Sequence, residues 1–392
     1  MLIDRPWLER VLGDLVRINS VNPLLSPGAP GEREIAAYVA QSLSPLPLVD
    51  TRMFEPATGR ITVLGTLRGS GGGPSLMFNA HSDTVAPGAM EQPFVATICD
   101  GKLFGRGAYD MKGSLAASLA ALKALAEAPA PLAGDVFLAA VADEEYGSLG
   151  TSDLLRYVQP DAAIVTEPTS LQVCLAHKGY LWIEVETTGR AAHGSRFDRG
   201  TDANLRMGRF LTALEGLEKS LRVRPPHPLV GPPSLHAAML SGGTGLSTYA
   251  ASSKVQIERR TIPGETEAQV FHELQSLVNE LQAADPTFRA TVRPYFVREP
   301  FEVRRDARIV QTVAETLQRV TGTKAIFIGD TPWMDAALLA ASGVETVVVG
   351  PTGGGAHADE EWVDLDSVAQ LAQILAETAV AYCGRQSFAK SF

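Results

Sequence analysis

The pattern of apolar runs changes twice along the chain, and these changes limit the fold more than any other sequence feature. Before the first change, short apolar runs typical of buried strands alternate with stretches of helical periodicity, and an amphipathic helix is expected within residues 1–20. The alternating runs lie at 75–79, 112–127, 135–142, 152–158 and 162–165. This alternation favours an α/β fold with a mostly parallel sheet covered by helices.

From about residue 180 the expected order is strand, helix, strand, strand, helix, strand, as in a ferredoxin-like α+β unit. These runs lie at 181–188, 202–221, 235–240, 254–261, 265–284 and 288–296. The α/β pattern then resumes at 307–320, 325–328, 334–341, 346–349 and 366–382. We therefore expect one α/β domain in two parts, 1–178 and 297–392, with a second domain inserted at 179–296.

Composition excludes several classes of partner. The net charge of -10, without a run of Lys or Arg, argues against nucleic acid. No apolar stretch approaches the roughly 20 residues that cross a bilayer, so no membrane partner is expected. The 3 cysteines are scattered and lack CxxC spacing, which argues against a disulfide framework and favours a cytoplasmic location.

Acidic and imidazole side chains gather in five short segments, most of which directly follow an expected strand. A lone His or Asp at a strand end is more often a solvated loop residue. Several at the carboxyl ends of strands in one sheet indicate a shared site. The segments are His81-Ser82-Asp83, Gly105-Arg106-Gly107-Ala108-Tyr109-Asp110, Asp143-Glu144-Glu145, Thr166-Glu167-Pro168 and Gly355-Ala356-His357.

The residue types in these segments indicate which metal would bind. Imidazole and carboxylate ligands without thiolate suit Zn²⁺, Co²⁺ or Mn²⁺, whereas Mg²⁺ and Ca²⁺ prefer shells made only of oxygen. Zinc is the first choice.

The ordered segments resemble the motifs of the M20 family of metallopeptidases and deacylases, which includes acetylornithine deacetylase, succinyl-diaminopimelate desuccinylase, aminoacylase and glutamate carboxypeptidase. The resemblance extends over nearly the whole chain. It implies a zinc-peptidase catalytic domain, an inserted lid and dimerisation domain, and two divalent metal ions. In this arrangement Asp110 bridges the ions, His81 and Glu167 complete one site, and Glu145 and His357 complete the other. The peptide between Asp110 and Met111 is expected to be cis.

Glu144 is the expected catalytic base. Two ions about 3.5 Å apart share a bridging water and polarise a carbonyl group. Adjacent residues leaving a strand point in different directions, so Glu145 can face an ion while Glu144 takes the proton of the water and passes it to the leaving nitrogen. Asp83 is expected to accept the second ring N–H of His81. The alternatives are a solvated acidic turn for Asp143-Glu144-Glu145 and a turn or N-cap role for Asp83.

Two residues of the inserted domain receive roles from the resemblance. His193 is expected to stabilise the oxyanion in the active site of a partner subunit, which implies a homodimer. The Arg259-Arg260 pair resembles the segment whose arginine grips the substrate carboxylate, a task that suits the planar fork of guanidinium. Neighbouring strand residues face opposite sides, so one arginine is expected to bind substrate. The motif favours Arg260 and leaves Arg259 for a surface or salt-bridge role.

One loop departs from the family pattern. Ser247, Tyr249 and Ala250 stand where an Asn and then Ile-Pro are commoner, so a hydroxyl of Ser247 or Thr248 would have to replace the amide. Gly354, in a run of three glycines, could offer its backbone N–H to an anionic substrate or could belong to a turn.

The expected function is hydrolysis of the amide bond of an N-acyl-amino acid, as in acetylornithine deacetylase. The enzyme alternatives are a metallocarboxypeptidase or dipeptidase, which would act on a short peptide, and a succinyl-diaminopimelate desuccinylase. The alternative outside enzymes is a silent homologue that binds metal or an amino acid. The acyl group and the amino-acid side chain remain open.

Overall fold

The computed structural model describes residues 2–384, and the chain separates into two compact units. Unit 1 comprises Met1–Leu175, Val303–Ile328 and Met334–Phe392, and unit 2 comprises Ala176–Glu302 and Gly329–Trp333. The second unit thus begins before the expected boundary at 179 and ends after 296. It also takes a short segment from the C-terminal part of the chain.

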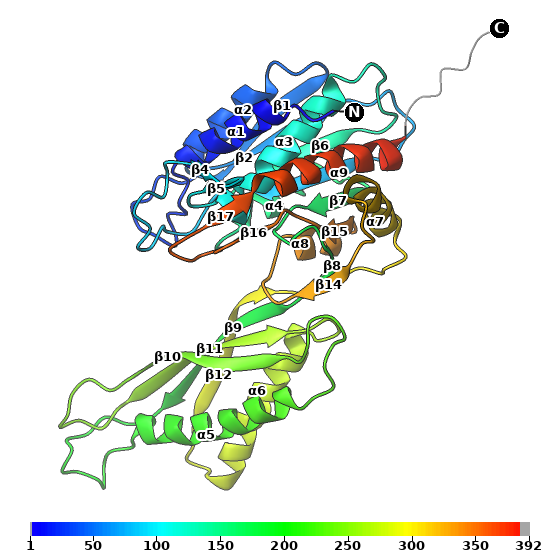
Figure 1. Cartoon of the computed structure of the whole chain (residues 1–392). Coiled ribbons are helices and arrows are strands. Elements are labelled where there is room, and N and C mark those ends of the chain that lie inside the picture. Colours follow the sequence, from blue (N-terminus) through cyan, green and yellow to red (C-terminus); the bar gives the residue numbers. More distant parts are fainter. Residues whose placement is uncertain (1, 385–392) are drawn as a thin grey trace. The chain divides into compact units, whose positions relative to one another are not determined.

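A mostly parallel sheet forms the centre of unit 1 (Figure 1). Strands β6, β3, β7 and β15 run parallel, while β1 and β2 at one edge and β8 at the other are antiparallel to their neighbours. Every residue of β3 is buried, in agreement with its continuous apolar sequence. The order across the sheet is β1 (Val49–Ala57), β2 (Arg60–Leu67), β6 (Val136–Val141), β3 (Leu76–His81), β7 (Ala162–Val165), β15 (Glu345–Val348) and β8 (Val173–His177), with the short strands β13 (Phe301–Glu302) and β14 (Phe327–Asp330) pairing with β8.

Helices of unit 1 cover this sheet. Helix α3, rich in Ala and Leu, is buried on all sides, which is typical of a helix enclosed by its neighbours. It packs against α1 and α9, and Figure 1 shows α3 and α9 side by side. The helices are α1 (Arg5–Arg17), α2 (Arg33–Leu43), α3 (Gly113–Ala126), α4 (Leu149–Leu154), α7 (Arg308–Thr321), α8 (Ala336–Ala341) and α9 (Leu365–Cys383).

A second, smaller sheet in unit 1 was not expected from the sequence. Its order is β16 (Gly353–Gly354), β17 (Trp362–Asp364), β5 (Lys102–Phe104) and β4 (Thr97–Cys99). Pairing of Trp362 with Phe104 brings the loop between β16 and β17 beside the segment that follows β5, which enters the irregular turn η1 (Ala108–Lys112). This sheet therefore joins the segments that contain His357 and Asp110.

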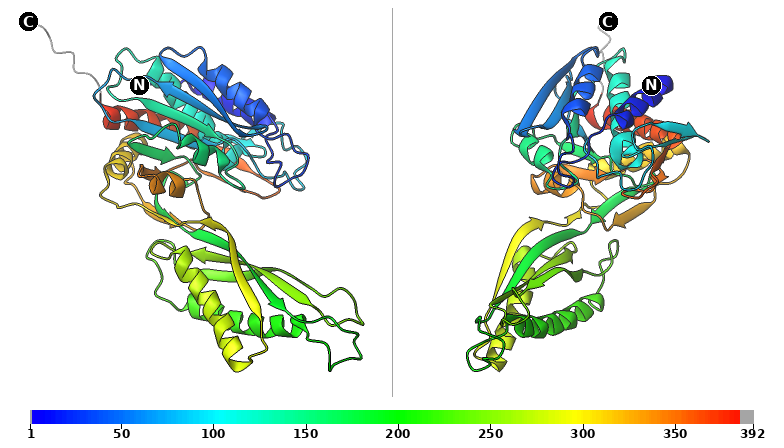
Figure 2. Two further views of the ribbon diagram at one scale, coloured as in Figure 1. Left: turned by 180° about the vertical axis from the view of Figure 1, so that it is seen from behind. Right: turned by 90° about the vertical axis from the view of Figure 1, so that its left-hand side faces the viewer.

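Unit 2 has the expected β-α-β-β-α-β order (Figure 2). Its antiparallel sheet has the order β10, β11, β9, β12, which is the ferredoxin-like arrangement. Residues alternate between buried and partly exposed along β9, and the buried side chains join a core with both helices. The elements are β9 (Gly179–Thr188), α5 (Ala203–Arg222), β10 (Ser234–Gly242), β11 (Ser252–Thr261), α6 (Glu267–Ala284) and β12 (Ala290–Arg298).

Most expected elements end close to the predicted residues, but the predicted helix at 152–158 is displaced. Helix α4 spans Leu149–Leu154. Gly150 lies against the end of β6, where a Cβ atom would stand 2.4 Å from the Ala142 nitrogen. Glycine permits this close approach, so the first turn of the helix packs directly against the end of β6. The β1–β2 hairpin was also missed.

Candidate metal centre

The five sequence segments meet at one edge of the unit 1 sheet. His81 ends β3, Glu144 and Glu145 follow β6, and Glu167 follows β7. These three strands are parallel neighbours, so their carboxyl ends lie together. Asp110 comes from the turn η1, and His357 comes from the loop between β16 and β17.

Asp110 lies between the two histidines. Its Oδ1 is 3.0 Å from Nε2 of His81, and its Oδ2 is 3.4 Å from Nε2 of His357. Glu167 Oε1 lies 3.6 Å from the His81 nitrogen, and Glu145 Oε2 lies 3.0 Å from the His357 nitrogen. The geometry gives two groups of one imidazole and one carboxylate, with Asp110 facing both.

The donor atoms fit metal ions. In each of the triads His81, Glu144, Glu167 and His81, Asp110, Glu145, the candidate ligand atoms lie within 4.8 Å of one another. Glu145 Oε1 is buried and has no hydrogen-bond partner among residues 2–384. A buried carboxylate oxygen is costly unless it is hydrogen-bonded or binds a cation. A metal ion would satisfy this atom.

The electrostatics of the cluster also favour cations. Burial and the neighbouring Glu167 carboxylate raise the pKa of Glu144 well above its usual range. Burial raises the pKa of Glu167 in the same way. Hydrogen bonds to Asp110 and Glu145 raise the pKa of His357 to about 10. Carboxylates this close repel one another in their ionised forms, and bound cations would remove that cost.

The turn that carries Asp110 is held by a residue that sequence reasoning missed. Glu361 is buried, and its carboxylate accepts hydrogen bonds from the backbone N–H groups of Gly107, Tyr109 and Asp110 at 2.8, 2.9 and 2.9 Å. The guanidinium of Arg106 lies 2.6 Å from the same carboxylate. In the sequence, the only signal for Glu361 was its position four residues after His357. The peptide between Asp110 and Met111 is cis, as expected.

The predicted contact of Asp83 needs correction. Its backbone carbonyl, rather than its carboxylate, accepts the hydrogen bond from His81 Nδ1 at 2.9 Å, while Oδ1 lies 3.8 Å away. The carboxylate instead accepts the backbone N–H groups of Glu144 and Glu145 at 3.1 and 3.3 Å. Short turns allow a backbone carbonyl to reach a nearby ring, which frees the side chain. Asp83 still orients His81, but through its main chain.

Another missed residue, Asp335, lies near Glu144 and Glu167. It is fully buried, and burial raises its pKa to about 6. Its Oδ2 accepts a hydrogen bond from the Thr151 hydroxyl at 2.5 Å. An acidic residue just before a short helix carried no distinctive sequence signal.

In unit 2 the expected residues lie in two adjacent loops. His193 and Ser247 are both exposed, and the backbone N–H of Gly194 donates to the Ser247 carbonyl at 2.7 Å. A bridge between His193 and Thr248 joins the same loops. His193 Nδ1 is 2.8 Å from the hydroxyl of Ser195. These residues are therefore neighbours within unit 2.

The two arginines differ clearly. Arg259 is buried, and its guanidinium forms two hydrogen bonds with Glu265, at 2.6 and 3.2 Å. Arg260 is 32% exposed at its side chain, donates through Nε to Glu258 at 2.7 Å and lies over the ring of Tyr180. The remaining candidate, Gly354, belongs to unit 1, where it lies in β16 against the indole of Trp362.

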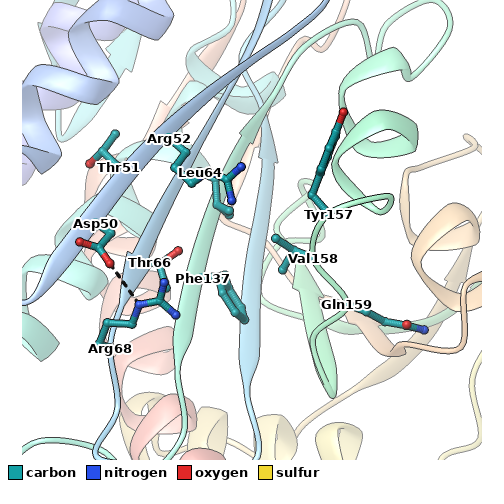
Figure 3. Close-up of a pocket in the computed structure, with 10 residues that line it drawn as sticks. All are labelled: Asp50, Thr51, Arg52, Leu64, Thr66, Arg68, Phe137, Tyr157, Val158 and Gln159. Carbon is teal, nitrogen blue, oxygen red and sulfur yellow. Dashed lines mark hydrogen bonds and ion pairs between the residues drawn. The ribbon is translucent and has the colours of Figure 1, made fainter.

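A pocket of about 570 Å³ opens elsewhere on unit 1 (Figure 3). Arg68 in this pocket pairs with Asp50 at 3.1 Å. None of the candidate metal ligands lines it. Its lining residues are Asp50, Thr51, Arg52, Leu64, Thr66, Arg68, Phe137, Tyr157, Val158 and Gln159.

Among the described helices, none combines the length and apolar character needed to cross a bilayer.

Comparison with known proteins identifies the family. The family described as peptidase family M20/M25/M40 matches residues 77–381. Acetylornithine deacetylase of Myxococcus xanthus is 31% identical over 332 residues, which cover 83% of this chain and 85% of that protein.

Solved structures agree with the fold. A tripeptidase from Staphylococcus aureus has a TM-score of 0.78 at 19% identity, covering 98% of this chain and 100% of its own. A dinuclear metal-binding peptidase of the M20 family from Bacillus subtilis has a TM-score of 0.72 at 15% identity, covering 97% and 98%. These named relatives hydrolyse amide bonds. The extent of the family match shows that this chain belongs to peptidase family M20/M25/M40.

Proposed function

We propose that this M20 amidohydrolase removes the acyl group of an N-acyl-amino acid with the help of two divalent metal ions, most favourably Zn²⁺. The observation that carries the proposal is the position of Asp110, whose two oxygens face His81 and His357 separately. The similarity of the whole chain to acetylornithine deacetylase supports the substrate class. His81, Glu167 and Asp110 would hold one ion, and His357, Glu145 and Asp110 the other.

Bound ions would supply a polarised amide carbonyl and a shared water of lowered pKa. Glu144 lies within reach of the same cluster, yet the proposed ligand set leaves it free. Its carboxylate would accept the proton of the water and donate it to the leaving nitrogen. His81 and His357 stay neutral when they bind ions, because only a deprotonated ring nitrogen is a ligand.

Recognition of the substrate carboxylate is assigned to Arg260. Arg259 is buried and committed to Glu265, whereas the guanidinium of Arg260 is partly exposed. Arg260 lies over the ring of Tyr180 and donates through Nε to Glu258, so its two Nη groups would bind the substrate carboxylate. Ser247 and Gly354 are proposed to contact the substrate through a hydroxyl and a backbone N–H.

We also propose a homodimer in which the exposed His193 completes the active site of the partner subunit by stabilising the oxyanion. The free cysteines Cys99, Cys174 and Cys383 fit a cytoplasmic location.

The test is a substrate panel of N-acetyl-, N-formyl- and N-succinyl-amino acids together with dipeptides, incubated with metal-loaded protein while amine release is measured. We expect turnover of an N-acyl-amino acid. Faster turnover of dipeptides would favour a peptidase, and preference for succinyl compounds would favour a desuccinylase. No turnover of any member would overturn the proposal in favour of a binding protein.

The assigned base is tested with Glu144→Gln. This variant should lower kcat by about 10²- to 10⁴-fold while it keeps both metal ions. Glu360→Gln is the matched control, because Glu360 is exposed and lies near His357. Wild-type rates in Glu144→Gln would show that another group acts as the base.

A further inference from the structure

The segment that carries the proposed base is held through its backbone. Three consecutive N–H groups, those of Asp143, Glu144 and Glu145, donate to buried carboxylates. Asp143 donates to Glu32 at 3.2 Å, while Glu144 and Glu145 donate to the two oxygens of Asp83 at 3.1 and 3.3 Å. The direction of the Glu144 side chain therefore depends on where these carboxylates lie.

A single guanidinium ties these carboxylates together. Arg60, at the start of β2, donates through Nε to Glu32 at 2.8 Å, and a second hydrogen bond joins its Nη2 to the same carboxylate. The same Nη2 lies 2.9 Å from Asp143 Oδ1 and 4.0 Å from Asp83 Oδ2. Asn22 completes the cluster, because its amide donates to both Asp83 and Asp143, at 2.8 and 3.0 Å.

Burial makes this cluster sensitive to small changes. The side chains of Arg60, Glu32, Asp83 and Asp143 are at most 5% exposed. Buried carboxylates repel one another unless a cation lies between them, and here Arg60 is the cation that contacts all three. Its planar fork fixes directions as well as charge, which lysine cannot reproduce.

We propose that Arg60 is a positioning residue for the reaction: it acts through Glu32, Asp83 and Asp143 to set the position of Glu144. The hydrogen bonds and ion pairs of Arg60 within residues 2–384 go to Glu32, Asn22, Asp83 and Asp143 and not to a proposed ligand, so its effect on catalysis is indirect. This inference rests on the proposed function, because it needs Glu144 as the base. Partners of this kind commonly contribute 10- to 100-fold to activity.

The experiment compares metal-loaded wild type, Arg60→Lys and Asn22→Ala with the best substrate of the panel. Lysine keeps the buried charge but loses the fork, and alanine removes the amide that joins Asp83 to Asp143. We expect kcat to fall roughly 10- to 100-fold in Arg60→Lys and several-fold in Asn22→Ala. KM should change little, and both variants should still bind two ions. Melting temperatures, measured in parallel, must lie above the assay temperature.

A matched control separates positioning from general damage to the fold. Arg68→Lys changes an exposed arginine just after the same strand, where it pairs with Asp50 and Asp135, and should leave kcat unchanged. In a double-mutant cycle, Arg60→Lys should have little further effect in the Glu144→Gln background, because no base remains to be misplaced. If Arg60 had a purely structural role, Arg60→Lys would lower kcat by the same factor in the wild-type and Glu144→Gln backgrounds.

Each outcome decides the inference. Equal kcat in Arg60→Lys and Arg68→Lys would overturn it, as would an equal factor in both backgrounds. If Arg60→Lys does not fold, an unchanged kcat in Asn22→Ala overturns it and a several-fold loss supports it. If wild type and Arg68→Lys turn over no substrate, the proposed function is wrong. If both are active and Arg60→Lys is equally active, only the role of Arg60 is wrong.

Discussion

The carboxylates at this site have different roles, which depend on the groups that surround each one. Glu144, the proposed base, has a raised pKa, whereas Glu361 accepts hydrogen bonds from three backbone N–H groups and pairs with Arg106. The Asp83 carboxylate, 3.8 Å from the ring of His81, accepts the backbone N–H groups of Glu144 and Glu145. Residue type alone does not distinguish these roles, because the environment of each carboxylate decides them.

Replacement of Glu361 should lower stability and activity more than replacement of the exposed neighbour Glu360. Glu361→Gln removes the negative charge beside buried Arg106 and should lower the free energy of unfolding by about 3 kcal/mol. Activity should fall roughly 10- to 100-fold, because the Asp110 turn loosens. Denaturant unfolding and kcat measurements check this against Glu360→Gln, which should resemble wild type. Equal stability of the two variants would contradict the assignment.

The titration of the Glu32 carboxyl should be visible in the pH dependence of stability. Burial raises its pKa to about 7, against an ordinary value of 4.5. The folded state therefore binds more protons than the unfolded state between these values, so this contribution to stability is complete below about pH 4.5 and is lost as pH rises to about 7. Glu32→Gln removes the titration. Denaturant unfolding from pH 4.5 to 8 should show wild type losing stability relative to the variant; a constant difference would disprove this.

Helices and strands differ in how far the nearby sequence determines where they form. The strands and helices of unit 2 follow from periodicity, because each buries one face against the same core. Helix α6 also carries its own start signal. Thr266 accepts the Gln269 N–H, and the Gln269 side chain accepts the Thr266 N–H. Strands β5, β16 and β17 are only two or three residues long and exist because they pair with one another.

Removal of this helix cap gives a prediction at the scale of one element. Thr266→Ala loses the side-chain acceptor and should destabilise unit 2 by about 1 kcal/mol. Thr266→Ser keeps the hydroxyl and should lose much less. Urea unfolding followed by circular dichroism compares the two, and metal content should be unaffected in both. Similar losses in both variants would mean that the methyl group, not the cap, matters.

For the molecule as a whole, stability and activity should depend on the same ions. Chelation of metal-loaded protein should abolish turnover and lower the unfolding free energy of unit 1 by about 3 kcal/mol, the value expected when free metal exceeds Kd 100-fold. Addition of Zn²⁺ should restore both. Calorimetry and elemental analysis provide the measurements. Full activity in protein that retains no metal would refute the two-ion assignment.

Ligand variants sharpen this prediction, since Asp110 presents one carboxylate oxygen to each histidine. Asp110→Asn should weaken the binding of both ions, whereas His357→Ala should weaken one. Elemental analysis at limiting zinc would show the difference, and equal stoichiometry in the two variants would exclude a shared ligand.

The sequence by itself determined most of the longer strands and helices, the inserted ferredoxin-like unit and the five segments that carry the candidate ligands. These features are local: periodicity depends on neighbouring residues, and polar groups follow the strands of an α/β sheet. The central sheet and the family were predicted correctly for this reason.

Only the tertiary structure decided which atoms meet. Glu361 contacts Asp110 across 251 positions of sequence, and Arg60 contacts Glu32 across 28. A buried charge must find a partner, but the sequence does not say which, because many residues far apart along the chain could provide it. The fold makes that choice when it pairs β17 with β5, next to the Asp110 turn, and brings Arg60 beside Asp143.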